Sequence, residues 1–130
     1  NLAWWLYLGR QFEQQLGTGL LLNVSLSVAL VSNAAQYFIV HPYFGGMSGV
    51  VYGLFGYFWL AGRLNPAQGL TISNGLAGFM LLWLLLGFMD LLWINMANWA
   101  HLGGLLAGFV WAWLLRKHNG QQQQLTDTDT

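Results

Sequence analysis

The spacing of the charged residues limits the fold of this chain more than any other feature. Only eight of its 130 residues are charged, and none lies between Glu13 and Arg63, between Arg63 and Asp90, or between Asp90 and Arg116. A helix of about 20 apolar residues crosses the ~30 Å hydrocarbon core of a bilayer, and each of these stretches is long enough to do so. Eight charges cannot supply the polar exterior of a water-soluble domain. The sequence therefore predicts an all-α, polytopic transmembrane helical bundle.

The apolar residues divide into five segments. The opening run, residues 1–8, is too short to span a bilayer, so we expect the chain to begin inside a transmembrane helix and to lack residues upstream. The other four segments lie at about residues 17–40, 47–62, 70–89 and 96–115. The last twelve residues are polar and rich in Gln, as is typical of disordered segments. We expect a membrane core over residues 1–118 and a disordered polar tail over 119–130.

The basic residues predict the orientation of these segments. If the chain crosses the membrane at each segment, then Arg10, Arg63, Arg116 and Lys117 all fall on one side, and the opposite side carries no basic residue. Loops enriched in Lys and Arg are cytoplasmic. We therefore expect the C-terminus to be cytoplasmic and residues 41–46 and 90–95 to lie on the other side.

The third segment is unusually short. Residues 47–62 make about 24 Å of helix, which is less than the ~30 Å hydrocarbon core. If Arg63 lies at the cytoplasmic interface, the Gly-rich residues 41–46 must dip below the opposite surface. Irregular backbone at that depth survives only when it is buried in protein or lines a water-filled cavity. The sequence thus predicts a water-filled depression open to the non-cytoplasmic side, with Ser48 at its floor.

Three polar side chains from three segments fall at a similar depth on that side: Ser48, His101 and Asn1. A serine nucleophile needs a base within hydrogen-bond reach, and histidine is the usual one. A helix N-terminus preceded by glycines, here Gly45 and Gly46, offers backbone N–H groups to an oxyanion, and an Asn side chain adds another donor. The arrangement favours nucleophilic catalysis.

Each of these residues also has an ordinary structural interpretation. A serine in a membrane helix usually serves packing or bonds to the backbone, and an intramembrane histidine can make an interhelical hydrogen bond. Small residues spaced four apart, such as Gly49 with Gly53 and Gly104 with Gly108, are common in helical bundles. The joint placement, and no single residue, supports a catalytic site.

Two local motifs resemble the rhomboid intramembrane serine proteases, with the bacterial members closest. One is Gly46–Gly49 at a predicted helix start, and the other is Ala100–Gly104 followed by Gly108. The similarity extends over nearly the whole chain except the Gln-rich tail, and includes the runs Phe44–Tyr52 and Met96–His101. Together these motifs are highly specific.

The resemblance implies a six-helix core, of which five helices are present here and the first of these is truncated. It implies a Ser–His dyad that cleaves in or near transmembrane segments of other proteins, with Ser48 as nucleophile and His101 as general base. It assigns Asn1 and the backbone N–H groups of Ser48 and Met47 to the oxyanion hole, and Tyr52 to stacking on the imidazole. Supporting roles go to Gly46, Gly49 and Gly104.

The sequence lacks the residues that other types of protease, thiolate metal sites and nucleic-acid binding need. The chain has no Cys, which excludes a thiol nucleophile and a thiolate metal site, and its zero net charge argues against nucleic-acid binding. An aspartyl protease needs two membrane carboxylates, but Asp90 is the only acid between Glu13 and the tail. No H-E-x-x-H run is present for a zinc protease. We expect no cofactor and no metal, with membrane-protein substrates and the lipid bilayer as partners.

Some alternatives stay open at this point. A pseudoprotease of the same family would bind membrane helices without cleaving them, and a small transporter or channel subunit would use the same wet cavity. Asp90 is a weak candidate for a third triad member, and segment 70–89 with the loop 90–95 is a candidate gate. For the protease we expect a multi-pass protein of the bacterial inner membrane whose active site opens to the periplasmic side.

Overall fold

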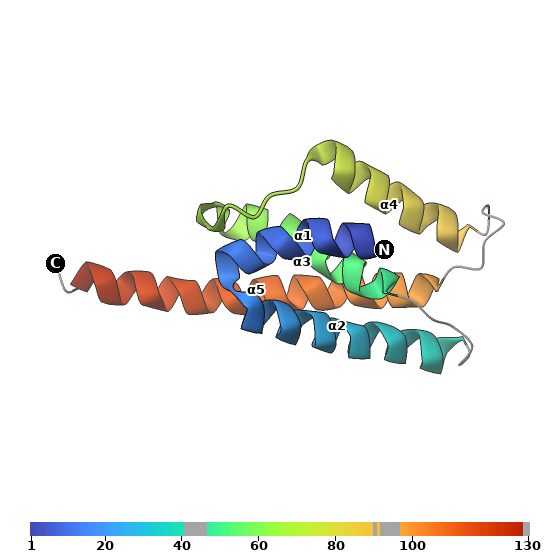
Figure 1. Ribbon diagram of the computed structural model, residues 1–130, viewed down its shortest axis with the longest axis horizontal. Coiled ribbons are helices and arrows are strands. Elements are labelled where there is room, and N and C mark those ends of the chain that lie inside the picture. Colours follow the sequence, from blue (N-terminus) through green and yellow to red (C-terminus); the bar gives the residue numbers. More distant parts are fainter. Residues whose placement is uncertain (41–46, 90, 92–96, 129–130) are drawn as a thin grey trace.

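The computed structural model describes residues 1–40, 47–89, 91 and 97–128, with side chains up to residue 116. This part of the chain forms five α-helices and one short 3-10 helix, and it contains no strand (Figure 1). The helices are α1 (Leu2–Leu16), α2 (Thr18–Ile39), α3 (Ser48–Leu64), α4 (Asn74–Phe88) and α5 (Asn98–Thr128), with the 3-10 helix η1 (Pro66–Gln68) between α3 and α4. The predicted all-α bundle is confirmed.

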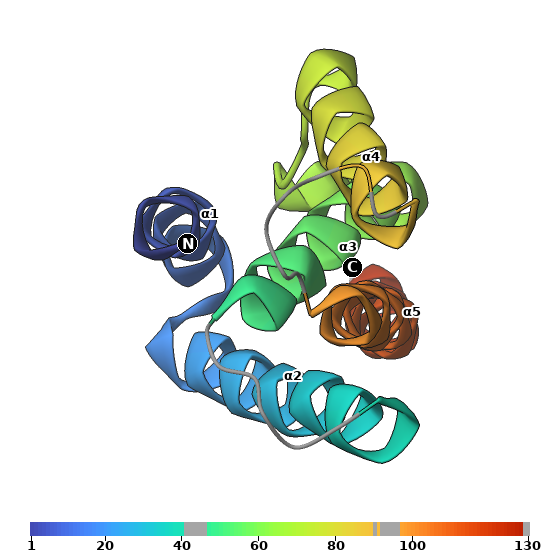
Figure 2. The same ribbon diagram turned by 90° about the vertical axis from the view of Figure 1, so that its right-hand side faces the viewer.

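Helix α3 is the central element of the bundle. Seen along the helices, it lies between α1, α2, α4 and α5 (Figure 2), and every residue from Gly49 to Phe58 is buried. A helix that is apolar on all sides is expected in the middle of a bundle. Its first turn, which carries Ser48, is therefore held by neighbours on several sides.

Glycines bring α3 and α5 into backbone contact. A Cβ atom added at Gly104 would overlap the carbonyl oxygen of Gly49, and one added at Gly108 would overlap the carbonyl oxygen of Gly53. Within a membrane, helices associate through such close packing because lipid is as apolar as their side chains. The two glycine pairs that the sequence offers thus form one seam along α3 and α5.

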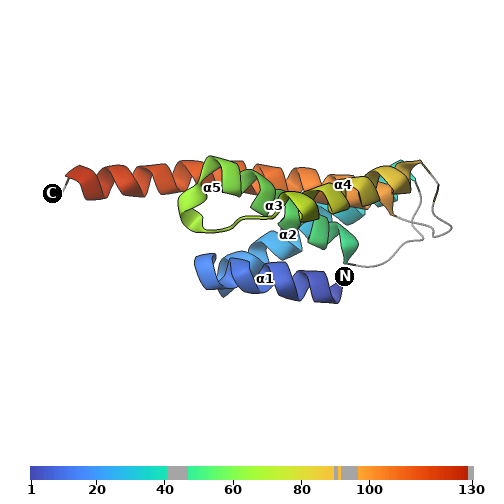
Figure 3. The same ribbon diagram turned by 90° about the horizontal axis from the view of Figure 1, so that it is seen from above.

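The helices alternate in direction. The N-terminal ends of α1, α3 and α5 and the C-terminal ends of α2 and α4 lie toward the same end of the bundle (Figures 1 and 3). This arrangement brings the beginnings of the helices that carry Asn1, Ser48 and His101 to one end, as the alternation in the sequence predicts.

Helix boundaries differ from the apolar segments in three places. Helix α1 continues past Arg10 to Leu16, because Leu8 and Phe12 extend its buried stripe, and it ends where Gly17 adopts a φ of +91°. Residues 70–73 precede α4 in non-helical backbone, and the Ser73 hydroxyl caps α4 by accepting the N–H of Leu76 at 3.1 Å. Helix α5 continues through residues 119–128, and the disorder of the tail stays a prediction.

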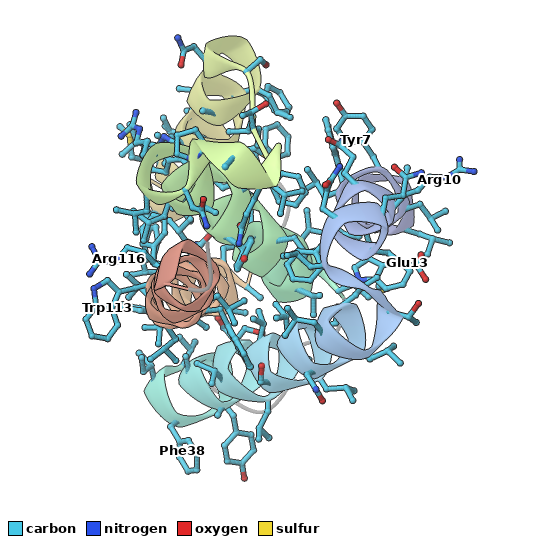
Figure 4. All side chains as sticks on the ribbon, turned by 90° about the vertical axis from the view of Figure 1, so that its left-hand side faces the viewer. Tyr7, Arg10, Glu13, Phe38, Trp113 and Arg116 are labelled. Carbon is cyan, nitrogen blue, oxygen red and sulfur yellow. The ribbon has the colours of Figure 1, made fainter. Side chains whose placement is uncertain are left out.

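The surface of the bundle is strongly apolar. Helix α2 is long and apolar enough to cross a membrane, and α4 is a shorter apolar helix. Around the perimeter, Tyr7, Phe38 and Trp113 point away from the bundle, as do the charged side chains of Arg10 and Arg116 (Figure 4). Exposed leucines on α2 are Leu22, Leu26 and Leu30.

Candidate active site

Ser48 is the first residue of α3. Met47 precedes it as the N-cap, and the Met47 carbonyl accepts the N–H of Val51 at 3.1 Å. The first N–H groups of a helix have no acceptor within the helix and carry the positive end of its dipole. Ser48 is partly exposed and Gly49 behind it is buried. A partly accessible hydroxyl therefore lies among backbone donors suited to an anion.

His101 lies in the first turn of α5 and is 3% exposed. Its ring stacks on the ring of Tyr52, with centroids 4.7 Å apart and planes at 26°. Tyr52 follows Ser48 by one turn of α3, and its hydroxyl donates to the Met80 carbonyl of α4 at 2.9 Å. One tyrosine thus fixes the plane of the imidazole and connects three helices beside it.

The backbones around Ser48 and His101 are in close contact. A Cβ atom at Gly49 would lie 3.1 Å from the carbonyl oxygen of Ala100. The residue after Ser48 therefore touches the residue before His101, and both side chains belong to the same end of the α3–α5 seam. Within the described residues, no hydrogen bond joins the Ser48 hydroxyl to the imidazole. Catalytic hydrogen bonds are often long before substrate binds.

Asn1 is the N-cap of α1. Its carbonyl accepts the N–H of Trp5 at 2.9 Å, while its side chain is exposed and makes no capping bond. The start of α1 lies toward the same end of the bundle as the starts of α3 and α5 (Figure 1). The side-chain amide of Asn1 is therefore uncommitted at the end of the bundle that carries Ser48.

Two polar residues of α2, neither of them predicted from the sequence, support this end of the bundle. Gln36 is buried, and its Oε1 accepts the N–H groups of Trp99 and Ala100 at 3.1 and 3.3 Å, which caps α5 directly before His101. Ser32, one turn earlier and also buried, packs against Gly49. Their spacing of four residues within the apolar segment 17–40 could have predicted that both lie on one buried face of the helix.

Several predicted features lie outside the described residues. These are the loop 41–46 with Gly46, the residue Asp90 and most of the loop 90–95. The third triad member, the gate loop and the dip of the Gly-rich loop therefore stay predictions. Gly104, by contrast, lies against Gly49 as described above.

Comparison with known proteins adds independent information. The family profile of the rhomboid domain matches residues 1–118. The chain is also similar to the rhomboid protease GlpG of Pectobacterium atrosepticum, with 49% identity over 112 residues, or 86% of this chain and 41% of that protein. This chain thus spans less than half of the length of that relative.

Proposed function

This chain belongs to the rhomboid family, and from that membership we propose that the full-length protein is an intramembrane serine endopeptidase. It hydrolyses peptide bonds in or near transmembrane segments of membrane proteins through a dyad of Ser48 and His101. The observation that carries the proposal is the position of the two residues. Ser48 begins α3 and the imidazole of His101 rests on Tyr52 one turn later, at a seam where the two backbones touch.

The proposed chemistry uses these groups in sequence. His101 takes the Ser48 hydroxyl proton as Oγ attacks the scissile carbonyl carbon, which converts the carbonyl oxygen to an oxyanion. The N–H groups at the start of α3 and the side chain of Asn1 stabilise this oxyanion. His101 then gives its proton to the leaving amine, and the C–N bond breaks to leave an acyl-enzyme. Water, deprotonated by His101, hydrolyses the ester and restores Ser48.

The setting of the site follows from the same topology. We place the protein in the bacterial inner membrane, with the site opening to the periplasmic side and the C-terminus in the cytoplasm. The exposed apolar side chains of α2 face lipid. The substrates are transmembrane proteins whose helices must unwind locally to present a peptide bond. Residues 1–118 supply the membrane core and 119–130 the polar tail.

Labelling with a fluorophosphonate tests the proposal. The full-length protein in detergent is treated with the reagent, and the number of adducts is read by intact mass. We expect one adduct on the parent protein and none on Ser48→Ala or His101→Ala, because phosphonylation needs an activated serine. Ser73→Ala, which removes an exposed hydroxyl at the start of α4, is the control and keeps the adduct.

Two other outcomes would contradict the proposal. A folded parent protein that takes no adduct would favour a pseudoprotease that binds membrane helices without cleavage. An adduct that persists in Ser48→Ala would assign the nucleophile to a different residue.

A further inference from the structure

Two buried polar atoms near the site have no hydrogen-bond partner within the described residues. They are Nδ1 of His101 and Oδ1 of Asn98. Buried side-chain polar atoms in folded proteins nearly always have a partner, so each such atom needs an explanation. The two residues are three apart on α5 and therefore lie on the same face of the helix.

The orientation of the Asn98 amide is fixed by its other end. Nδ2 donates to the carbonyl of Gly87, at the C-terminal end of α4, with a distance of 2.8 Å. A reversed amide would place two oxygen atoms against each other, so the hydrogen bond itself assigns the nitrogen. Oδ1 is therefore the free acceptor, and the connection to α4 holds it inside the bundle.

The free acceptor and the imidazole belong to side chains three residues apart on α5. Side chains three residues apart on a helix have Cβ atoms about 5–6 Å apart. A bridging water between two polar groups is nearly as favourable as a direct hydrogen bond. In such a bridge Nδ1–H donates to the water, and the water donates to Oδ1 of Asn98.

We propose that Asn98 is a positioning residue that holds the proton of His101 on Nδ1 through one bridging water. The hydrogen bond at one ring nitrogen determines the protonation of the other, so Nε2 keeps a free lone pair for the Ser48 proton. Tyr52 fixes the plane of the ring and Asn98 fixes its tautomer. This inference rests on the proposed function of His101 as the general base.

The test compares two variants of the full-length protein that change different hydrogen-bonding groups of Asn98. Asn98→Leu removes both the donor and the acceptor, whereas Asn98→Asp keeps an oxygen acceptor but loses the bond to Gly87. With 15N-labelled histidine, NMR reports which ring nitrogen carries the proton. We expect Nδ1 to be protonated in the parent protein and in Asn98→Asp, and a mixture of tautomers in Asn98→Leu. The control is the same substitution at the exposed Asn23 of α2, which leaves the tautomer unchanged.

Peptidase kinetics supply a second readout. In Asn98→Leu we expect kcat to fall roughly tenfold or more while KM stays constant, because the base and not substrate binding is impaired. An Asn98→Leu protein in which His101 still has a single tautomer, with the proton on Nδ1, would overturn the proposal. So would an Asn98→Asp protein with the same mixture as Asn98→Leu, because the Gly87 bond would then be the cause. The NMR measurement does not depend on activity, so it tests the role of Asn98 separately from the dyad. Labelling of a His101→Ala protein by the fluorophosphonate would reject the dyad and leave the tautomer result unaffected.

Discussion

Tyr52 shows how one side chain serves both the site and the packing around it. Its ring lies on His101 of α5, and its hydroxyl bonds to the backbone of α4 at Met80. The ring contact holds the imidazole at a fixed tilt, while the hydroxyl anchors the neighbouring helix. These two roles are separable by substitution, since phenylalanine keeps the ring and loses only the donor.

We expect Tyr52→Phe to react with fluorophosphonate at nearly the parent rate, and Tyr52→Ala to react at least roughly tenfold more slowly, a difference of about 1.4 kcal/mol in the barrier. Tyr52→Phe loses about 1 kcal/mol of stability with its hydrogen bond. Tyr57→Phe is the matched control, because the Tyr57 hydroxyl bonds to Gln68 at 3.3 Å, away from the imidazole. Equal slowing in Tyr52→Phe and Tyr52→Ala would contradict the role of the ring.

At the scale of the helix, the glycine seam determines how α3 and α5 fit. Gly104 and Gly108 of α5 lie against the carbonyl oxygens of Gly49 and Gly53 of α3. Because the neighbouring atoms are backbone, they cannot move aside as the end of a flexible side chain would. The seam therefore has little tolerance for any added atom.

Gly104→Ala tests this intolerance. The added methyl group meets the Gly49 carbonyl, and we expect a loss of about 1–3 kcal/mol of unfolding free energy, as for other overpacked sites. The same substitution at Gly78 of α4 has nothing within 4 Å, and we expect it to be neutral or to stabilise by up to about 1 kcal/mol. Unfolding in mixed SDS and detergent micelles measures both variants. Equal effects would show that α3 and α5 do not depend on backbone contact.

The sequence predicts the helices of this chain better than it predicts their partners. The apolar segment 17–40 predicts both ends of α2 to within one residue, because a membrane span is recognised from its length and composition alone. It does not show that α1 continues past Arg10, because that extension depends on tertiary burial of Phe12. Gln36 bonds to Ala100 at the start of α5, 64 residues away in the sequence, and this contact depends on how α2 and α5 pair. Local patterns carry no information about such a pairing.

For the whole molecule, the basic residues Arg63 and Arg116 lie far along α3 and α5 from Ser48 and His101. Arg63 lies in the last turn of α3, and Figure 4, which views the bundle from that side, shows Arg10 and Arg116 pointing outward. The end that carries Ser48 and His101 is the opposite one. The positive-inside rule therefore predicts that the end with Ser48 and His101 faces away from the cytoplasm.

Residues 1–130 contain no Cys, so a single cysteine introduced among them tests this orientation directly. We introduce one cysteine at Ala67, exposed in η1, or at Leu91, exposed beyond α4, and treat intact cells with a membrane-impermeant maleimide. The positive-inside rule places Ala67 in the cytoplasm and Leu91 outside it. We expect Leu91→Cys to be labelled in intact cells and Ala67→Cys only after lysis. The reverse pattern would invert the proposed topology.

The backbone contact between α3 and α5 also closes one side of α3. Where two helices touch through glycines, no side chains stand between them that could part to make room for a lipid acyl chain. Over the turn from Gly49 to Gly53, the seam therefore leaves no space between α3 and α5 for a lipid chain. If Ser48 is the nucleophile proposed above, we expect a substrate that diffuses laterally in the bilayer to reach it past the other sides of α3. The smallest residues of the protein thus limit the sides of α3 from which such a substrate can approach.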